Sequence, residues 1–185
     1  EEFERQTEKL VEAILTLDAD VLGLVELEND FLAGSSGNAI ETLVNRLNQI
    51  AGEGTYDWVD PGQQFVDVSD AISVGAIYKP GKVSIAAGTN PAILTDANLP
   101  DEFDGEVIFN GRSTNRAPLA VTFEEIETGG KFTIAVNHFK SKGSVFDEPG
   151  NTDIGDGLAY NNAMRVQASE ARSAWLASDP TDSGD

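Results

Sequence analysis

The sequence predicts a layered α/β domain, because helix-forming and strand-forming patterns alternate along the chain. Apolar residues recur at helical spacing in three stretches, around residues 3–17, 39–50 and 160–176. Between them lie short runs rich in β-branched and aromatic residues, bounded by glycine and proline, which is typical of strands. The order helix, strand, helix, many strands, helix favours helices packed on sheets, and roughly six strands would make one sheet and part of another.

The composition limits the class of protein. With 185 residues, of which 40% are hydrophobic, the chain is long and apolar enough for one domain with a core, or for a large part of a bigger one. It has 32 acidic residues against 12 basic ones, for a formal net charge of -20, so most of its surface repels nucleic acid and anionic membranes. Any site for a polyanion must therefore be a local basic patch.

Several features are absent from the sequence. There is no cysteine, which excludes a disulfide and a thiolate metal site. No apolar run approaches the ~20 residues that a membrane helix needs, so we expect no membrane span. No motif for a protein partner is evident. High acidity with few lysines suits a salty environment, where acidic side chains keep a surface hydrated.

Two helices and one strand are predicted in the first part of the chain. The first helix carries apolar residues at helical spacing between Phe3 and Leu17, and a strand follows at Val21–Val25. That strand is apolar throughout, so we expect it to be buried with a neighbour on each side. A glycine- and serine-rich loop then leads to a second helix over about Ala39–Ile50.

Strand patterns dominate the centre of the chain. Pro80-Gly81 and Thr128-Gly129-Gly130 each lie between two apolar runs and indicate hairpins. Residues 88–104 are expected to be loop, as is the Gly/Asp-rich stretch 143–158. The predicted strands are Tyr56–Val59, Ile72–Tyr78, Val83–Ala87, Val107–Phe109, Leu119–Phe123 and Phe132–Val136.

The end of the chain is predicted to hold one more helix and a linker. The helix runs from about Tyr160 to Leu176, and residues 179–185 are polar. The chain opens inside a helical pattern and stops after a helix, where another strand would be expected. We therefore expect residues 1–178 to be part of a domain, and residues 179–185 to be a polar linker leading to its missing C-terminal part.

His138 is the only histidine, and it ends an apolar strand beside an amide and two ammonium groups. Imidazole can gain or lose a proton near neutral pH, and lysines nearby can hold an anion for it. In so acidic a chain, this gathering of scarce cations favours a site for an anionic substrate. The alternative is a partly buried histidine with lysines on an exposed turn, and a short motif does not decide between the two.

Two further residues stand at strand ends. Glu26 follows the apolar strand 21–25, where an open α/β sheet places ligand chemistry, and a carboxylate there suits Mg²⁺ together with water and substrate oxygens. Glu28 is better explained as a solvent-facing side chain. Arg116 leads into the strand Leu119–Phe123 with a planar fork suited to phosphate oxygens, although it could equally pair with one of the many carboxylates.

In this order and spacing, the motifs resemble the endonuclease/exonuclease/phosphatase superfamily, the fold of pancreatic deoxyribonuclease. The resemblance covers nearly the whole chain, and Asn137–Ser144 with Gly155-Asp156-Gly157 are most similar to the branch of secreted and surface-attached bacterial nucleases. The matching segments are Leu24–Asn29 for a strand ending in a Gln-Glu pair (with Val25 in place of the glutamine), Ala76–Val83 for an aromatic, basic, proline hairpin, Arg116-Ala117-Pro118 for an Arg-X-Pro strand entry and Val136–Phe139 for the central histidine strand.

The resemblance implies a layered β-sandwich flanked by helices and metal-assisted hydrolysis of a phosphodiester, with Mg²⁺ or Mn²⁺ as the cofactor. Glu26 would ligate the ion, His138 would hydrogen-bond the scissile phosphate or protonate the leaving oxygen, and Arg116 would contact phosphate or orient His138. It also implies an extracellular or cell-surface nuclease acting on DNA, or on RNA, with its signal peptide outside this chain. From charge and position we add three contacts to the phosphate backbone: Asn137, Lys140 and Lys142.

The departures from the family pattern limit what the chain would do alone. Many members of that branch have a cysteine pair, and the matching stretches 144–146 and 158–160 contain none. The family's first strand with its Asn would precede residue 1, and its Gly-Asp-X-Asn strand and Asp-His pair would follow residue 185. We therefore expect the N-terminal half to two-thirds of the domain, able to fold or to bind a metal weakly without turnover.

Other functions stay open on the sequence. Asp147–Gly157 alternates acidic residues with glycines and could bind Ca²⁺, although it lacks EF-hand spacing and a solvated loop explains it better. A non-catalytic, acidic, calcium-dependent binding or adhesion module would explain the charge, but not the gathering of Arg112, Arg116, Lys140 and Lys142. A lipid or monoester phosphatase or phosphodiesterase on the same fold would differ in its loops, which the sequence does not resolve.

Overall fold

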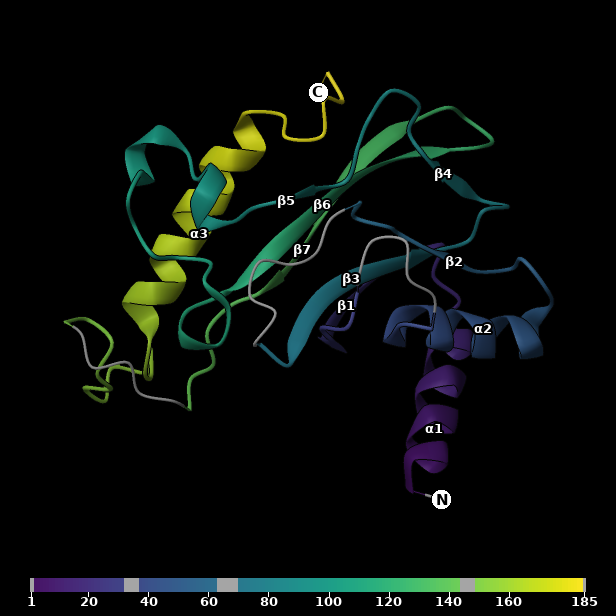
Figure 1. The fold of residues 1–185 in the computed structure, drawn as a ribbon, viewed down its shortest axis with the longest axis horizontal. Helices are drawn as coiled ribbons and strands as arrows, with labels where there is room; N and C mark the ends of the chain where they lie inside the picture. The colour runs from purple at the N-terminus through teal and green to yellow at the C-terminus, as the bar shows by residue number, and fades with distance from the viewer. Residues whose placement is uncertain (1, 32–36, 63–69, 144–148, 185) are drawn as a thin grey trace.

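The computed structural model describes residues 2–31, 37–62, 70–143 and 149–184, and it confirms the predicted α/β class (Figure 1). The helices are α1 (Glu2–Leu17), α2 (Ala39–Ala51) and α3 (Asn162–Ala177). The strands are β1 (Val21–Glu28), β2 (Asp57–Trp58), β3 (Ile72–Tyr78), β4 (Val83–Ile85), β5 (Ala92–Ile93), β6 (Arg116–Glu125) and β7 (Lys131–His138).

The strands form two antiparallel sheets that pack face to face. In one sheet β3 lies between β1 and β2; in the other, β6 pairs with β4 and β5 along one edge and with β7 along the other. The inner faces share one apolar core. Phe123 lies fully buried in it, with its ring centroid 5.4 Å from that of Tyr78 in the opposite sheet and 5.8 Å from that of Phe132. Burial of these faces holds the two sheets together.

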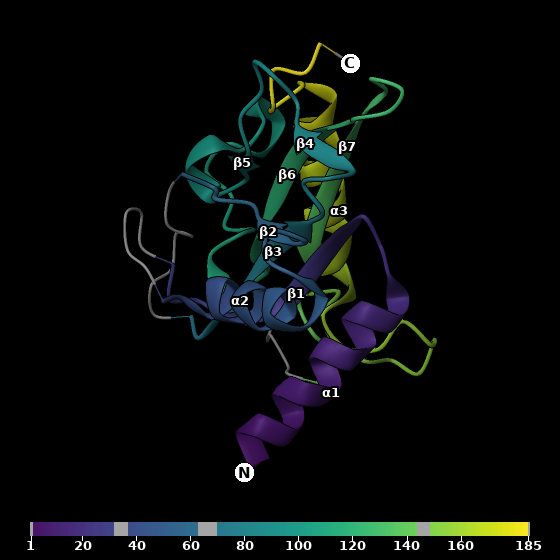
Figure 2. The same ribbon diagram turned by 90° about the vertical axis from the view of Figure 1, so that its right-hand side faces the viewer.

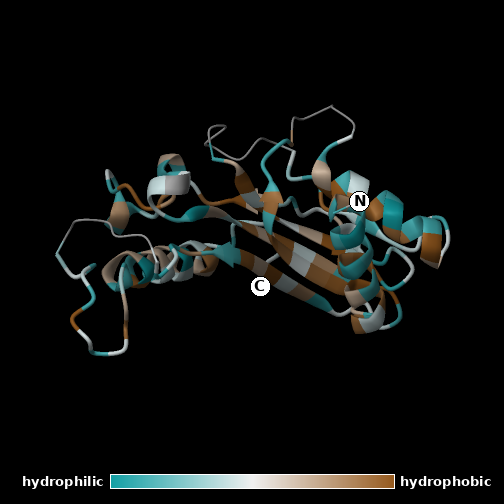
Figure 3. Cartoon of the chain, turned by 90° about the horizontal axis from the view of Figure 1, so that it is seen from below, coloured by the Kyte–Doolittle hydropathy of each residue, from teal (hydrophilic) through white to brown (hydrophobic). Residues whose placement is uncertain are grey.

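Helices cover the outer faces, so that the layers run helix, sheet, sheet, helix (Figure 2). Helices α1 and α2 bury Val11 and Leu47 against the outer face of the β1–β3–β2 sheet. Helix α3 buries Ala168 and Trp175 against the outer face of β6. Figure 3 shows the apolar residues concentrated on the central strands. None of the helices in the described part of the chain is both long and apolar enough to cross a membrane.

One of the two predicted hairpins is confirmed and the other is wrong. Strands β6 and β7 pair across a short turn, with Phe123 opposite Phe132. The turn at residues 79–82 instead carries the chain from one sheet to the other, because β3 pairs with β1 and β2 whereas β4 pairs with β6. A Pro-Gly turn reverses the chain without dictating which strands pair.

The prediction of a strand at Val107–Phe109 is wrong, because this segment is irregular. Asp96 Oδ1 accepts the backbone N–H groups of Ile108 at 2.9 Å and of Phe109 at 2.6 Å, so a carboxylate replaces a strand partner. Both side chains are buried in the layer beneath α3. A short apolar run reports burial and does not by itself define strand geometry. The predicted loop at 88–104, by contrast, contains β5, which pairs with β6.

Strand β1 is an edge strand, not the central strand that the sequence predicts. Within the described residues it pairs with β3 alone, and Val25 is 51% exposed. Leu22 and Leu24 pack toward the helices, while Val21 packs toward the inner core. The strand is apolar because two different layers cover its two faces. Burial of both faces does not require a paired strand along each edge.

The residues after α3, predicted to be a linker, fold back onto β6. Thr181 is buried, and its hydroxyl lies 2.6 Å from that of Thr122, which lies 2.7 Å from that of Thr133. The carboxylate of Asp179 accepts the backbone N–H of Ser183 at 2.9 Å and closes the turn. The polar residues at 179–184 are therefore not all exposed to solvent, because the hydroxyl of Thr181 makes a buried contact. The domain boundary proposed at residue 178 stays a prediction.

A Thr181→Val substitution tests whether this turn contributes to the fold. Without the hydroxyl, Thr122 loses one hydrogen-bond partner in a buried position, so we expect the free energy of unfolding to fall by about 1–2 kcal/mol. Thr152→Val, at an exposed position, is the matched control and should leave the free energy of unfolding unchanged. Chemical denaturation measures both. Equal stability of the two variants would show that the turn adds nothing to the fold.

Candidate functional site

Glu26 is placed by an irregularity in β1. The pairing of β1 with β3 shifts between Val25 and Leu27, which leaves Glu26 as the extra residue of a β-bulge, with φ of 58°. The extra residue lets Leu27 pack toward the helices, as Leu24 does before the bulge. The Glu26 side chain is 69% exposed. A non-glycine residue at positive φ is conformationally costly, and such residues gather at functional sites.

His138 reaches Glu26 from the other sheet. It is the last residue of β7, where Ile134 and Val136 face the inner core, so strand alternation turns the imidazole the same way. Its Nε2 lies 3.8 Å from Oε1 of Glu26. That distance permits an ion pair when the imidazole is protonated, but it is too long for a hydrogen bond. A carboxylate and an imidazole that are far apart in sequence thus meet at one end of the sandwich.

Arg116 stands beside His138, because the two residues pair across β6 and β7. Its Nε lies 2.8 Å from Oδ2 of Asp70, and its Nη2 donates to Oδ1 at 3.2 Å. The side chains are 15% and 4% exposed, respectively, so this is a buried ion pair. The sequence allowed for a carboxylate partner of Arg116 but did not reveal Asp70. The only feature of the sequence that could have indicated Asp70 was its position just before a predicted strand, and the chain has 32 acidic residues.

The backbone at Asp70 is tied to the end of β1. Asn29 Nδ2 donates to the carbonyl of Asp70 at 3.1 Å, and the Asn29 backbone N–H donates to the carbonyl of Ala71 at 3.1 Å. The ion pair is therefore anchored to the strand that carries the bulge. We call the resulting group the four-residue cluster; it consists of Glu26, Asp70, Arg116 and His138.

The surroundings of His138 hold the pKa of its imidazole below the ordinary value of 6.5. Burial is the largest cause, because it disfavours the charged form, and the guanidinium of Arg116 acts in the same direction. The carboxylates of Glu26 and Asp70 oppose the shift with smaller effects. The neutral form of the imidazole therefore predominates at pH 7. Its Nδ1 is buried and has no hydrogen-bond partner among the described residues.

The three predicted phosphate contacts lie outside the four-residue cluster. Asn137 lies on the face of β7 opposite to His138, and its Nδ2 donates to a carbonyl of its own strand at 2.7 Å. Lys140 lies just beyond β7, where its backbone N–H donates to Oδ1 of Asn115 at 2.8 Å. Lys142 is exposed. A role for these three side chains in binding phosphate stays a prediction.

Glu26 is the member of the cluster that could hold a metal ion. The part of the chain that the structure describes contains no group of three or more His, Cys, Asp or Glu side chains placed to hold one. The carboxylate of Asp70 is paired with Arg116, whereas the carboxylate of Glu26 faces solvent. One carboxylate, with waters and substrate oxygens, is a usual environment for Mg²⁺. The donor set therefore fits Mg²⁺ or Mn²⁺ held mainly by water and substrate.

The acidic loop considered for calcium lies only partly within the described residues. Asp147 and Glu148 fall outside them, as does the side chain of Arg112. Asp153 and Asp156 are exposed, and each accepts a local backbone N–H at 2.9 Å. These contacts form turns within the loop. Binding of Ca²⁺ there stays a prediction.

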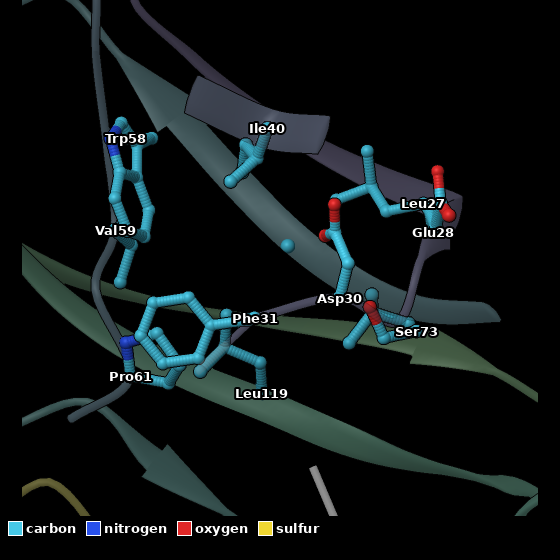
Figure 4. A pocket seen from close by; sticks show the side chains of 12 residues that line it. Leu27, Glu28, Asp30, Phe31, Ile40, Trp58, Val59, Pro61, Ser73 and Leu119 are labelled. Carbon is cyan, nitrogen blue, oxygen red and sulfur yellow. The ribbon is translucent and has the colours of Figure 1, made fainter. Parts of the chain in front are cut away.

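A small cavity beside the bulge is a gap in packing and does not extend the cluster (Figure 4). Its volume of about 20 Å³ has room for one water molecule. Phe31 and Trp58 meet edge to face on one side of it, with ring centroids 5.5 Å apart. Asp30 lies on the other side, and its carboxylate accepts the backbone N–H of Ala39 at 2.9 Å, which caps the start of α2.

Two solved structures are similar to this chain. The human Nocturnin catalytic domain with bound sulfate anion is 20% identical, with a TM-score of 0.46, over 75% of this chain and 43% of that one. An endonuclease/exonuclease/phosphatase family protein from Bacteroides thetaiotaomicron is 14% identical, with a TM-score of 0.43, over 72% and 41%. The chain thus spans less than half of either structure. No protein-family model and no curated protein matches the sequence.

Because the chain has one histidine, the pKa of His138 can be measured directly by NMR. We expect its Hε1 resonance to titrate with a midpoint below pH 6.5. The unfolded chain then binds the proton more readily than the folded one. The contribution of His138 to stability is therefore present above pH 6.5 and is lost as the pH falls through 6.5 toward the folded-state pKa.

Two variants separate the causes of this shift. Arg116→Met should raise the pKa of His138, because it removes the cation and leaves Asp70 unpaired, whereas Glu26→Gln should lower it further. A wild-type midpoint at or above pH 6.5 would show that the carboxylates of Glu26 and Asp70 outweigh burial and Arg116.

Proposed function

We propose that this chain carries part of the catalytic site of a metal-dependent phosphodiester hydrolase. The observation that supports this is the meeting of a solvent-facing carboxylate, a neutral imidazole and a carboxylate-bound guanidinium at one end of the sandwich. Metal-assisted hydrolysis of a phosphodiester uses these three groups: a ligand for a divalent cation, a hydrogen-bonding group at the scissile phosphate and a fixed positive charge.

Glu26, His138 and Arg116 each have a separate role in the proposed reaction. Glu26 holds Mg²⁺ or Mn²⁺, and a bound divalent cation supplies positive charge at the phosphate oxygens. His138 hydrogen-bonds a phosphate oxygen through Nε2, the nitrogen nearest Glu26. Its lowered pKa favours this role over protonation of the leaving oxygen at neutral pH. Arg116 stabilises the negative charge that develops on the phosphate.

Nucleic acid is the proposed substrate, DNA first and RNA second. A net charge of -20 leaves no general surface for a polyanion, so the phosphate backbone must follow a local group of cations. Lys140 and Lys142 continue from the strand that carries His138. Arg165 steadies this loop, because its Nη1 donates to the carbonyls of Lys140 at 3.4 Å and Tyr160 at 2.7 Å.

We extend the proposal to an exported enzyme that acts outside the cell or at its surface. The support is the resemblance of residues 137–144 to secreted and surface-attached bacterial nucleases. A surface this acidic also stays hydrated in a salty environment.

Binding of Mn²⁺ tests the metal role of Glu26 without any requirement for turnover. We expect Mn²⁺ to broaden the Hε1 resonance of His138, because the imidazole lies 3.8 Å from the carboxylate that would hold the ion. Glu26→Gln should abolish the broadening. Glu28→Gln, an exposed carboxylate on the same strand, is the matched control and should preserve it. Broadening that survives in Glu26→Gln would place the metal elsewhere.

Substitution of His138 tests the chemical role in the protein expressed at its natural full length. We expect His138→Ala to reduce Mg²⁺-dependent cleavage of plasmid DNA by ~100-fold or more, as for the loss of a positioned polar group in a transition state. The melting temperature should change little, because Val136 anchors the strand in the inner core.

Lys142→Ala is the matched control for that experiment. Loss of this exposed cation should weaken DNA binding and reduce its dependence on salt, with an unchanged rate at saturating DNA. If His138→Ala lowers the melting temperature sharply and leaves the activity per folded molecule unchanged, His138 is a packing residue and the proposed role is wrong.

A further inference from the structure

Asp70 is a buried carboxylate to which the proposed reaction assigns no task. Its side chain is 4% exposed, and both of its oxygens face the guanidinium of Arg116, at 2.8 Å and 3.2 Å. Within the described residues, its ion pair is with Arg116, whereas Glu26 lies beside His138. Its interactions therefore act on the arginine.

Stability alone is a weak reason for such a pair. Moving a carboxylate and a guanidinium out of water carries a desolvation cost that their attraction often fails to exceed, and well-packed apolar residues can replace such pairs without loss. A buried pair with one charge-assisted hydrogen bond and a second close ionic contact does, however, restrict the direction of a guanidinium, which a flexible arginine chain does not do by itself. The geometry points to control of orientation.

The orientation that results leaves part of the arginine available. Nη2 donates a hydrogen bond to Asp70, Nε lies 2.8 Å from Oδ2 in an ion pair without hydrogen-bond geometry, and no hydrogen bond from Nη1 is found within the described part of the chain. The Arg116 side chain keeps 15% of its surface exposed, beside its strand partner His138. Because Asn29 ties the Asp70 backbone to the end of β1, the direction of the guanidinium is set relative to the strand that carries Glu26.

We propose that Asp70 is a positioning residue that aims Arg116 at an anionic phosphate oxygen bound beside His138. This inference rests on the proposed function, because it names how that site receives its substrate. The competing explanation is that the pair only fastens the segment before β3 to the start of β6. A fastening role predicts a loss of stability alone, whereas a positioning role predicts a loss of anion binding in folded molecules.

Inorganic phosphate, added without metal at pH 7.5, is the probe, and the Hε1 resonance of His138 reports its binding. We expect Asp70→Asn to raise the dissociation constant for phosphate about tenfold, the size of effect expected when a charge-assisted hydrogen bond is misdirected. Arg116→Met should cause a similar rise. The double variant should bind no more weakly than either single variant, because both changes remove one interaction.

A control removes an ion pair that lies before the start of β1. Lys79 Nζ lies 2.6 Å from Oδ1 of Asp18, which is 80% exposed, so Asp18→Asn breaks a carboxylate–cation contact far from the cluster. This variant should bind phosphate as the wild type does. If Asp70→Asn also binds phosphate as the wild type does, and only its melting temperature falls, Asp70 is a fastener and the inference is wrong.

Failure of the proposed function has a different signature. If the wild-type protein does not bind phosphate at His138, the anion site itself is wrong, and the role of Asp70 fails with it. One measurement needs no variant to fold: in the wild type, the Nε–H proton of Arg116 should exchange with water more slowly than that of the exposed Arg5. Equal exchange rates would show that the guanidinium is not held, which overturns the positioning role.

Discussion

Strands β1 and β7 belong to different sheets, yet they approach so closely that a methyl group on Gly23 would lie 3.0 Å from Cγ2 of Val136. Only a residue without a side chain permits this contact without a shift of the valine. The two strands continue past it in the same region of the molecule, one to Glu26 and the other to His138. The 3.8 Å approach of carboxylate and imidazole depends on this packing, because β1 and β7 are not paired with each other among the described strands.

Around the four-residue cluster, the sheets depart from regular geometry. The bulge at Glu26 inserts one residue, so that Leu27 still meets the helices while the carboxylate turns to solvent. The pairing of β6 with β7 also shifts, between Arg116 and Leu119, next to the start of the strand. Both irregularities lie near strand ends, where fewer ladder hydrogen bonds are lost than in the middle of a sheet.

The charge balance of the cluster is local. The chain as a whole carries a net charge of -20, which would be expected to favour a protonated histidine. The pKa of His138 is nevertheless lowered, because burial and Arg116 act at short range. Charges beyond about 8 Å are screened at physiological salt, so the rest of the acidic surface has little effect on the ring. Asp70 balances the charge of Arg116 at close range, because their side chains form a buried ion pair.

The sequence by itself determined the layered α/β class, the three helices and the β6–β7 hairpin, because each depends on local periodicity or turn chemistry. It also singled out Arg116 and His138, which begin β6 and end β7, and Glu26, which lies at a bulge within β1 and not at its end. The tertiary structure alone decided that β3 and β4 join different sheets, that β1 lies at an edge, and that Asp70 binds Arg116. These features depend on contacts between segments far apart in the chain, and a local pattern reports how much a residue is buried without reporting what buries it.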